Sequence, residues 1–287
     1  MTDFVQFASA HGVLIRNLDS SGRIRRCPTA EHPRSDNGAY MWDGQRGWVF
    51  AWDGAAEPQW FNDPSAKPWT EADKKAFAAK REAERRQQAA RQQRAAQHAA
   101  ELLKTARLDS HNYLHFKGLP MAQGLVLPDD GLFVPMRGLA GGLQGAQIIR
   151  WDHENRRYDK RMLPGMKAKG AVLRIGPPRS METVLCEGYV TGLSIEAAIR
   201  QMRLSAAVLV CFSANNLVHV APAVSGRKYV FADNDESGTG ERVARETGLP
   251  YCMSDRAGED ANDLYVRAGL LPVCQRLMEV RRERVAA

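Results

Sequence analysis

Two stretches decide the fold of this chain, VLCEG at residues 184–188 and YVFADND at residues 229–235. Each is an apolar, β-like run that leads into carboxylates. The segments between them alternate in type: a helix-like pattern at residues 190–202, a β-like run at 207–212 and an amphipathic segment at 217–224. Strands that alternate with helices indicate an α/β fold with a parallel sheet and right-handed crossovers. Glu187, Asp233 and Asp235 are therefore expected at carboxyl ends of strands, where open α/β sheets hold their active sites.

The spacing of the carboxylates favours a metal site. Asp233 and Asp235 point to the same face if the strand continues through them, because strand side chains alternate. Like carboxylates held close together raise one another's pKa unless a cation neutralises them, and Mg²⁺ is bound by one or two carboxylates together with water and phosphates. The alternative is a solvated turn at residues 233–238, since Asp and Asn are common in turns. Glu187, which ends another strand of the same unit, favours the metal site.

A basic segment precedes these carboxylates. Residues 150–179 hold nine Lys or Arg side chains against three acids. Several cations on one surface beside the chemistry are typical of phosphate binding, whereas the alternative is a solvated charge run. Four of these cations, Lys160, Arg161, Lys167 and Lys169, cluster with loop residues at 160–170, ahead of the predicted site.

Residues 187–194, EGYVTGLS, together with the DND at 233–235 resemble the signature of Toprim domains. These domains are shared by bacterial-type primases, type IA and II topoisomerases, and certain nucleases and recombination proteins. Further stretches resemble the primase branch of phages and plasmids: HNYLHFKGL at 111–119, LFVP at 132–135, KRMLPG at 160–165, ANNL at 214–217 and GEDANDL at 258–264.

The resemblance implies an arrangement of domains. We expect a Toprim catalytic domain at 181–287, with a central, mostly parallel sheet flanked by helices, and a basic β-rich subdomain of the primase core before it at 109–180. A long helical spacer is expected at 67–108 and a small β-rich, zinc-ribbon-like domain at 1–66.

The resemblance also implies roles for single residues. Glu187, Asp233 and Asp235 would be catalytic and would hold Mg²⁺ or Mn²⁺, and Asp260 and Asp263 would complete the acidic metal site. A metal there lowers the pKa of a ribose hydroxyl and, with nearby cations, stabilises the phosphorus transition state. The residues expected to bind nucleotide or DNA are Lys160, Arg161, Lys167, Lys169 and Asn216.

The first 66 residues contain four of the six tryptophans, and turn signals separate short apolar runs. This pattern predicts hairpins. Cys27, His32 and His11 suggest zinc, but a structural zinc site needs four ligands and the usual ligand pairs are absent. A metal-free ribbon is therefore favoured over a zinc site.

Residues 70–73, TEAD, form a capping box, and no Gly or Pro follows until beyond Ala106. The composition of this stretch is rich in helix formers, and residues 82–100 carry no apolar side chain larger than alanine. A solvated spacer helix is favoured over a helix that tracks DNA.

Charge and composition limit the class of protein. The net charge of +7 suits a polyanionic partner. The chain has no C-x-x-C pair, no signal-peptide pattern and no long apolar stretch, so we expect a protein without membrane association in the bacterial or phage-infected host cytosol. No G-x-x-x-x-G-K-[ST] motif is present, so a motor function is disfavoured and a separate replicative helicase is an expected partner.

The leading hypothesis is a DNA primase-like nucleotidyltransferase that makes short RNA primers from NTPs on single-stranded DNA. A Toprim metal-dependent nuclease uses the same carboxylates and stays open as an alternative. A non-catalytic DNA-binding adaptor of a phage or plasmid replication complex is the third hypothesis. A topoisomerase is disfavoured, because no tyrosine nucleophile is recognisable in a further domain.

Overall fold

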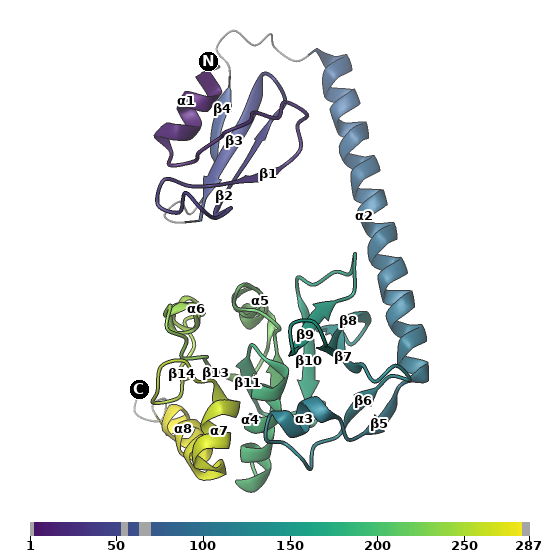
Figure 1. The fold of residues 1–287 in the computed structure, drawn as a ribbon, viewed down its shortest axis with the longest axis vertical. Coiled ribbons are helices and arrows are strands. Elements are labelled where there is room, and N and C mark those ends of the chain that lie inside the picture. Colours follow the sequence, from purple (N-terminus) through teal and green to yellow (C-terminus); the bar gives the residue numbers. More distant parts are fainter. Residues whose placement is uncertain (1–2, 53–56, 63–69, 283–287) are drawn as a thin grey trace. The chain divides into compact units, whose positions relative to one another are not determined.

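The computed structural model describes residues 3–52, 57–62 and 70–282. The chain divides into two compact units, one up to Arg81 and one from Glu82 onward (Figure 1). Of the helices in the described ranges, none combines the length and the apolar character needed to cross a membrane.

The first unit is a four-stranded antiparallel sheet with one helix. Its elements are α1 (Asp3–Ala10), β1 (Arg25–Cys27), β2 (Gly38–Trp42), β3 (Arg46–Ala51) and β4 (Gln59–Asn62), with the strands paired in chain order. The Phe4 ring of α1 stacks on Trp42 with 4.4 Å between ring centroids. Gly47 allows β3 to lie close to the backbone of β2, because a Cβ there would lie 2.2 Å from the carbonyl oxygen of Met41. Aromatic packing between helix and sheet therefore forms the core of this unit.

The candidate zinc ligands of this unit have other surroundings. Cys27 is buried in the aromatic core, and burial raises the pKa of its thiol to about 11. The His11 ring lies on Phe7 with 4.3 Å between centroids. Because zinc binds the thiolate, the burial of Cys27 favours a neutral core side chain.

The second unit is built on a ten-stranded mixed sheet. Its parallel strands are β11 (Glu182–Cys186), β12 (Ala206–Val210), β13 (Arg227–Phe231) and β14 (Tyr251–Cys252). Its antiparallel part comprises β5 (Arg107–Asp109), β6 (Gly124–Val126), β7 (Leu132–Gly138), β8 (Leu143–Asp152), β9 (Arg157–Met162) and β10 (Ala171–Ile175), and β10 joins the two parts through β12. The predicted α/β class is confirmed.

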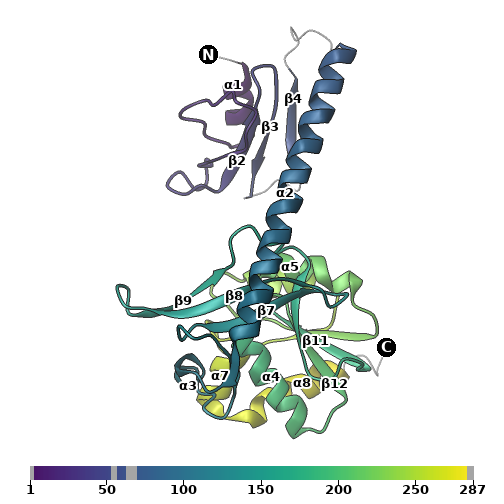
Figure 2. The ribbon, with the colours of Figure 1, turned by 90° about the vertical axis from the view of Figure 1, so that its right-hand side faces the viewer.

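Helices cover both faces of the parallel strands (Figure 2). The helices are α3 (Asn112–Phe116), α4 (Tyr189–Gln201), α5 (Ala214–Val220), α6 (Thr239–Glu246), α7 (Ala261–Ala268) and α8 (Leu270–Arg282), with a 3₁₀ turn at Ala221–Ala223. Val184 and Cys186 of β11 pack under α4, α7 and α8. Leu185, between them, packs under α5 and α6 on the other face. The period of two along a fully apolar strand thus supplies both layers of the core.

The long helix α2 (Glu71–Thr105) begins with the predicted capping box. The backbone N–H of Thr70 donates to Asp73 Oδ2 at 3.0 Å, and the N–H of Asp73 donates to Thr70 Oγ1 at 3.2 Å. The buried residues of the helix are Ala95 and Ala99. Ala99 packs with Phe133 of β7 and Ile148 of β8, so the carboxyl-terminal part of α2 rests on the antiparallel part of the sheet.

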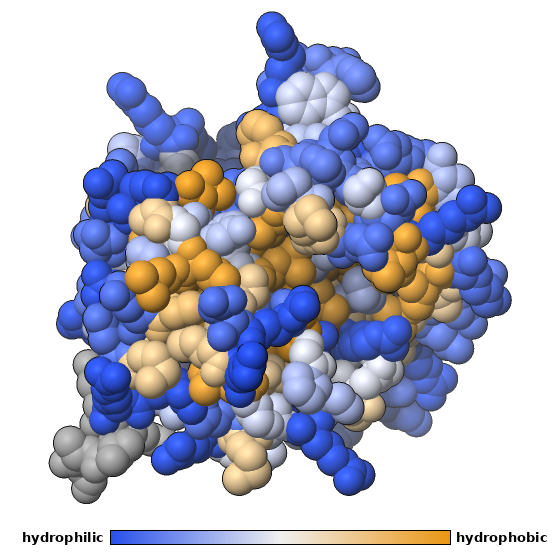
Figure 3. Space-filling view, turned by 90° about the horizontal axis from the view of Figure 1, so that it is seen from below, coloured by the Kyte–Doolittle hydropathy of each residue, from blue (hydrophilic) through white to orange (hydrophobic). Residues whose placement is uncertain are grey.

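Helix α3 packs against α7, which follows it by more than 140 residues. Asn262 Nδ2 donates to the carbonyl oxygen of Lys117 at 2.9 Å, and a Cβ on Gly118 would lie 2.6 Å from Val266 Cγ2. Phe116 and Val266 are exposed beside this contact. The face at the foot of Figure 1, where α3 and α7 lie, accordingly shows apolar groups among charged ones (Figure 3).

Candidate metal centre

Two neighbouring parallel strands bring the first carboxylates together. Strands β11 and β13 pair in register, with Leu185 opposite Val230. Glu187 directly follows β11, and Asp233 lies two residues beyond the end of β13. Both side chains therefore stand at the same edge of the sheet, at the carboxyl ends of the strands, as the sequence predicts.

Asp233 is the most perturbed carboxylate of this edge. Its pKa is raised to about 7, first by burial and then by the negative charges of Asp260, Glu187, Asp235 and Asp263. Its Oδ1 atom is buried and has no hydrogen-bond partner among the described residues. A buried carboxylate among other carboxylates is protonated or neutralised by a cation, so Asp233 is the group with the greatest need of a positive charge.

Glu187 lies at the same edge, and one hydrogen bond partly satisfies its carboxylate. Burial raises the pKa of its carboxyl and the charge of Asp235 raises it further, whereas a hydrogen bond from the backbone N–H of Ala214 lowers it. The carbonyl oxygen of Glu187 accepts from the N–H of Phe212 at 2.8 Å. The chain after β12 is thus tied to Glu187 through both its backbone and its carboxylate.

Asp235 is placed differently from the sequence expectation. Strand β13 ends at Phe231, so it does not continue through Asp233 and Asp235, and the condition under which strand alternation would point both side chains to one face is not met. The Asp235 carboxylate accepts from the backbone N–H groups of Thr239 at 3.0 Å and Gly240 at 2.7 Å. The Ser237 hydroxyl, followed by these N–H groups, lowers its pKa. Asp235 therefore serves the turn and the start of α6 while still placing its charge near Asp233.

The approach of α6 depends on Gly240. A Cβ at this position would lie 2.0 Å from the carbonyl oxygen of Asp233. No real Cβ fits at that distance, so a glycine is required for α6 to begin against the backbone of Asp233.

Asp260 and Asp263 form the capping box of α7. Asp260 Oδ1 accepts from the backbone N–H groups of Asn262 at 2.7 Å and Asp263 at 2.9 Å. Asp260 Oδ2 accepts from the Thr191 hydroxyl at 2.6 Å. Both oxygens of Asp260 are thus engaged, and its charge acts on Asp233 from the start of the helix.

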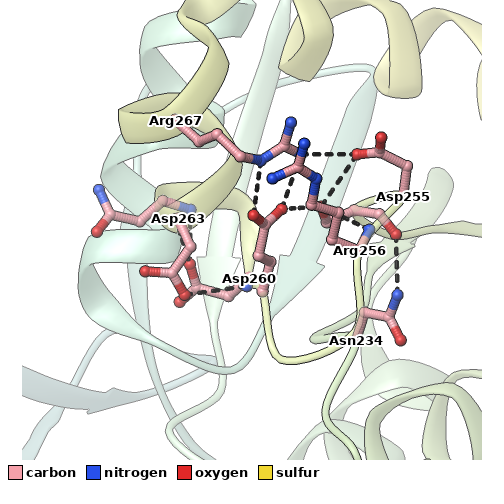
Figure 4. A network of polar contacts seen from close by, with 9 residues as sticks. Asn234, Asp255, Arg256, Asp260, Asp263 and Arg267 are labelled. Carbon is pink, nitrogen blue, oxygen red and sulfur yellow. Dashed lines mark hydrogen bonds and ion pairs between the residues drawn. The ribbon is translucent and has the colours of Figure 1, made fainter.

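A polar network holds the loop before Asp260 against residues 233–235 (Figure 4). The N–H of Asn234 donates to the carbonyl oxygen of Glu259 at 3.0 Å, and Asn234 Nδ2 donates to the carbonyl oxygen of Ser254 at 3.1 Å. Arg267 of α7 donates to the carboxylates of Glu259 at 2.6 Å and Asp255 at 2.8 Å. The loop is therefore fixed at both ends, which also fixes the distance between the carboxylates after β13 and those at the start of α7.

Sequence reasoning missed the parts played by Thr191 and Arg267. Thr191 has one local signal, its place in the first turn of the helix after Glu187. Arg267 has none, because its partners lie across a loop and its position looks like an ordinary exposed helix site.

Only some of the carboxylate oxygens are available to a divalent ion. Across the described ranges, no group of three or more His, Cys, Asp or Glu side chains is close enough to hold a metal ion between them. The unsatisfied Asp233 Oδ1 and the partly satisfied Glu187 nevertheless suit a hard cation, which takes one or two protein carboxylates and completes its coordination with water and phosphate oxygens. Asp235, Asp260 and Asp263 would contribute negative charge around that ion.

The predicted cations are spread over several elements. Lys160 Nζ lies 5.6 Å from the centroid of the Tyr113 ring, and Arg161 Nε lies 2.5 Å from Asp159 Oδ2. Lys160 and Arg161 are neighbours on β9, so they point to opposite faces of that strand. Lys167 and Lys169 are exposed on the loop that follows.

A cavity of about 510 Å³ opens beside the segment that follows β12. Asn216 fixes its wall. Its Oδ1 accepts from the N–H of Gly170, and its Nδ2 donates to the carbonyl oxygens of Ala171 and Cys211, each at 2.7 Å. The lining side chains include Met162, Lys169, Phe212, Ser213, Asn216 and His219. The cavity thus places an apolar surface and a cation next to the segment bonded to Glu187.

Comparison with protein families agrees with this geometry. The family model of the Toprim domain matches residues 182–270, from the start of β11 to the first residue of α8. Comparison with curated proteins yields no match, and comparison with solved structures yields none either. The carboxylates described above all lie within the matched segment, and residues 182–270 of this chain are a Toprim domain.

Proposed function

We propose that this protein is a primase-like nucleotidyltransferase that joins NTPs into short RNA primers on single-stranded DNA. Toprim domains occur in primases, nucleases and topoisomerases, and they bind Mg²⁺ or Mn²⁺ through acidic residues. The observation that carries the proposal is the unsatisfied, buried Oδ1 of Asp233 among four other carboxylates. The cavity beside the segment that is hydrogen-bonded to Glu187, with its cation and apolar wall, supports a nucleotide as substrate.

Asp233 and Glu187 would hold the Mg²⁺ or Mn²⁺ ion, and Asp235, Asp260 and Asp263 would add negative charge around it. The ion would supply activation of the attacking hydroxyl and neutralisation of phosphate charge. Within the chain, the hydrogen bond from the Ala214 backbone orients the Glu187 carboxylate. The N–H groups at the start of α6 keep Asp235 ionised and in place.

The cavity would receive the incoming nucleotide. Phe212 and Met162 offer apolar surface to a base, and Lys169 offers an ammonium group to a phosphate. Asn216 contributes by fixing the loop that carries Lys169, since its side-chain amide is bonded to the backbone on both sides of the cavity wall. Lys160, Arg161 and Lys167 extend the positive charge toward the template.

Primer synthesis tests the proposal. The full chain is incubated with single-stranded DNA, NTPs and Mg²⁺ or Mn²⁺, and the expected products are short RNAs. Glu187→Gln should abolish them, whereas Glu246→Gln, the same exchange at an exposed site on α6, should leave them unchanged. Absence of product with every template and metal contradicts the proposal.

The same carboxylates would serve a metal-dependent nuclease, because hydrolysis needs the metal and not the nucleotide cavity. An arm of the assay without NTPs separates the two functions. Nicking or degradation of DNA or RNA that is lost with Glu187→Gln would replace synthesis by cleavage. DNA binding without either activity would favour a non-catalytic adaptor.

For the primase we propose action in a bacterial or phage-infected cytosol, with a separate replicative helicase to unwind the template.

A further inference from the structure

The middle of α2 carries charge that the helix does not neutralise. Residues 85–100, RRQQAARQQRAAQHAA, contain four arginines and no acid. Three cations of this helix are paired with acids at helical spacing: Lys74 Nζ lies 2.7 Å from Glu71, Arg86 Nε 2.9 Å from Glu82 and Lys104 Nζ 2.8 Å from Glu101. Among the described residues no carboxylate pairs with Arg91 or Arg94, and both are exposed.

None of the helix positions that could neutralise these two arginines holds an acid, and three of them hold amides. Residues three and four apart on a helix are neighbours, and Glu–Arg pairs at that spacing stabilise it. Gln87 and Gln88 precede Arg91 at this spacing, and Gln97 follows Arg94. Arg91 and Arg94 are themselves three apart, which places like charges side by side. A helix that served only as a solvated spacer would gain from glutamate here, so the unneutralised charge points to a ligand.

The docking of α2 places Arg91 beside the basic loop. Ala95 and Ala99 are buried on the sheet, and one turn earlier Arg91 meets the loop after β9. Gly165, in the left-handed region with φ of 78°, would carry a Cβ 3.7 Å from Arg91 Cβ. Lys167 and Lys169 follow Gly165 within four residues and are exposed. The lower part of α2 and this loop belong to the same unit (Figure 2).

We propose that Arg91 and Arg94 of α2, together with Lys167 and Lys169, form a track that binds the phosphate backbone of single-stranded nucleic acid. This proposal rests on the proposed function and deepens it, because it identifies a helix outside the Toprim domain as a template-binding element. Arg91 and Arg94 lie on one flank of the helix, about 4.5 Å apart along its axis. Contacts of this kind read charge and not sequence.

Salt-dependent binding of the full chain tests the track. The probe is a fluorescent oligo-dT strand, measured by anisotropy without metal or NTPs over a range of NaCl concentrations. Each phosphate contact on a single strand contributes about 0.7 to the slope of log K against log salt. The double variant Arg91→Gln and Arg94→Gln should flatten that slope by about 1.4 and weaken binding about 25-fold at 0.1 M salt, with little change near 1 M.

Two further variants make the result decisive. Lys74→Gln with Lys104→Gln removes the same net charge from paired sites of the same helix and should change the slope little. Arg91→Lys with Arg94→Lys retains the charge and should bind like the wild type. Arg, Lys and Gln have similar helix propensities, so circular dichroism should be unchanged throughout. An unchanged slope in the Arg91 and Arg94 glutamine variant, or an equal loss in the Lys74 and Lys104 control, overturns the proposal.

The binding assay and the primer assay distinguish a failure of the track from a failure of the proposed primase function. Salt-dependent binding that is lost in the glutamine variant establishes the track even if no primers are made. Primer synthesis that persists while the variant binds like the wild type rejects the track and keeps the catalytic proposal.

Discussion

Replacing Asp233 with asparagine should stabilise the metal-free protein at alkaline pH. The folded protein raises the pKa of this carboxyl from its ordinary value of 3.8 to about 7, so it holds a proton that the unfolded chain releases. The resulting cost to folding is zero below pH 3.8, grows as the pH rises and is fully present above pH 7. Asp233→Asn removes a charge that burial and the neighbouring carboxylates disfavour.

The size of this effect follows from the pKa. A shift of one unit corresponds to about 1.4 kcal/mol, so the shift at Asp233 amounts to at most about 4 kcal/mol at pH 8. For a unit of this size each kcal/mol moves the melting temperature by roughly 2–4 °C. Asp233→Asn should therefore raise the Tm by at most roughly 16 °C at pH 8 in EDTA and by little at pH 4.

A divalent cation should reduce this difference in stability. Mg²⁺ or Mn²⁺ bound at Asp233 neutralises the charge and favours the folded state by mass action. Thermal unfolding of both proteins at pH 8, with EDTA and with millimolar Mg²⁺, measures the two effects. The ion should raise the Tm of the wild type and leave Asp233→Asn unchanged. The reasoning is refuted if Asp233→Asn is no more stable than wild type at pH 8 in EDTA, or if Mg²⁺ stabilises both equally.

Three other substitutions probe what positions the carboxylates. Thr191→Val removes the hydroxyl that donates to Asp260 and should lower the free energy of unfolding in urea by about 1–3 kcal/mol. Thr191→Ser keeps a hydroxyl and should retain most of the stability. Equal stability of the two variants would argue against a stabilising hydrogen bond to Asp260. Gly240→Ala should displace α6 from the Asp233 backbone, cost about 1–3 kcal/mol and abolish stabilisation by Mg²⁺; a Mg²⁺ response like that of wild type would contradict this. Arg267→Gln should speed amide hydrogen exchange in residues 254–260 without changing exchange in β11, and unaltered exchange in that loop would show that the ion pairs do not hold it.

The sequence by itself determined the layout of the Toprim domain and the place of its main carboxylates. Alternating apolar strands and helical segments are local patterns, and strand ends place Glu187 and Asp233 at one edge whatever the rest of the chain does. The capping box at Thr70 and the uninterrupted helix formers after it are local as well, and α2 runs from Glu71 to Thr105 as expected.

Only the tertiary structure decided how those carboxylates differ from one another. Asp235 belongs to the start of α6, Asp260 is held by a hydroxyl 69 residues away, and Asp233 alone keeps a buried oxygen without a donor. The packing of α2 against Gly165, which sets Arg91 beside the basic loop, is of the same kind. The contacts of Asp260 and of Gly165 join residues far apart in the chain, and the burial of Asp233 depends on neighbours that no local pattern records.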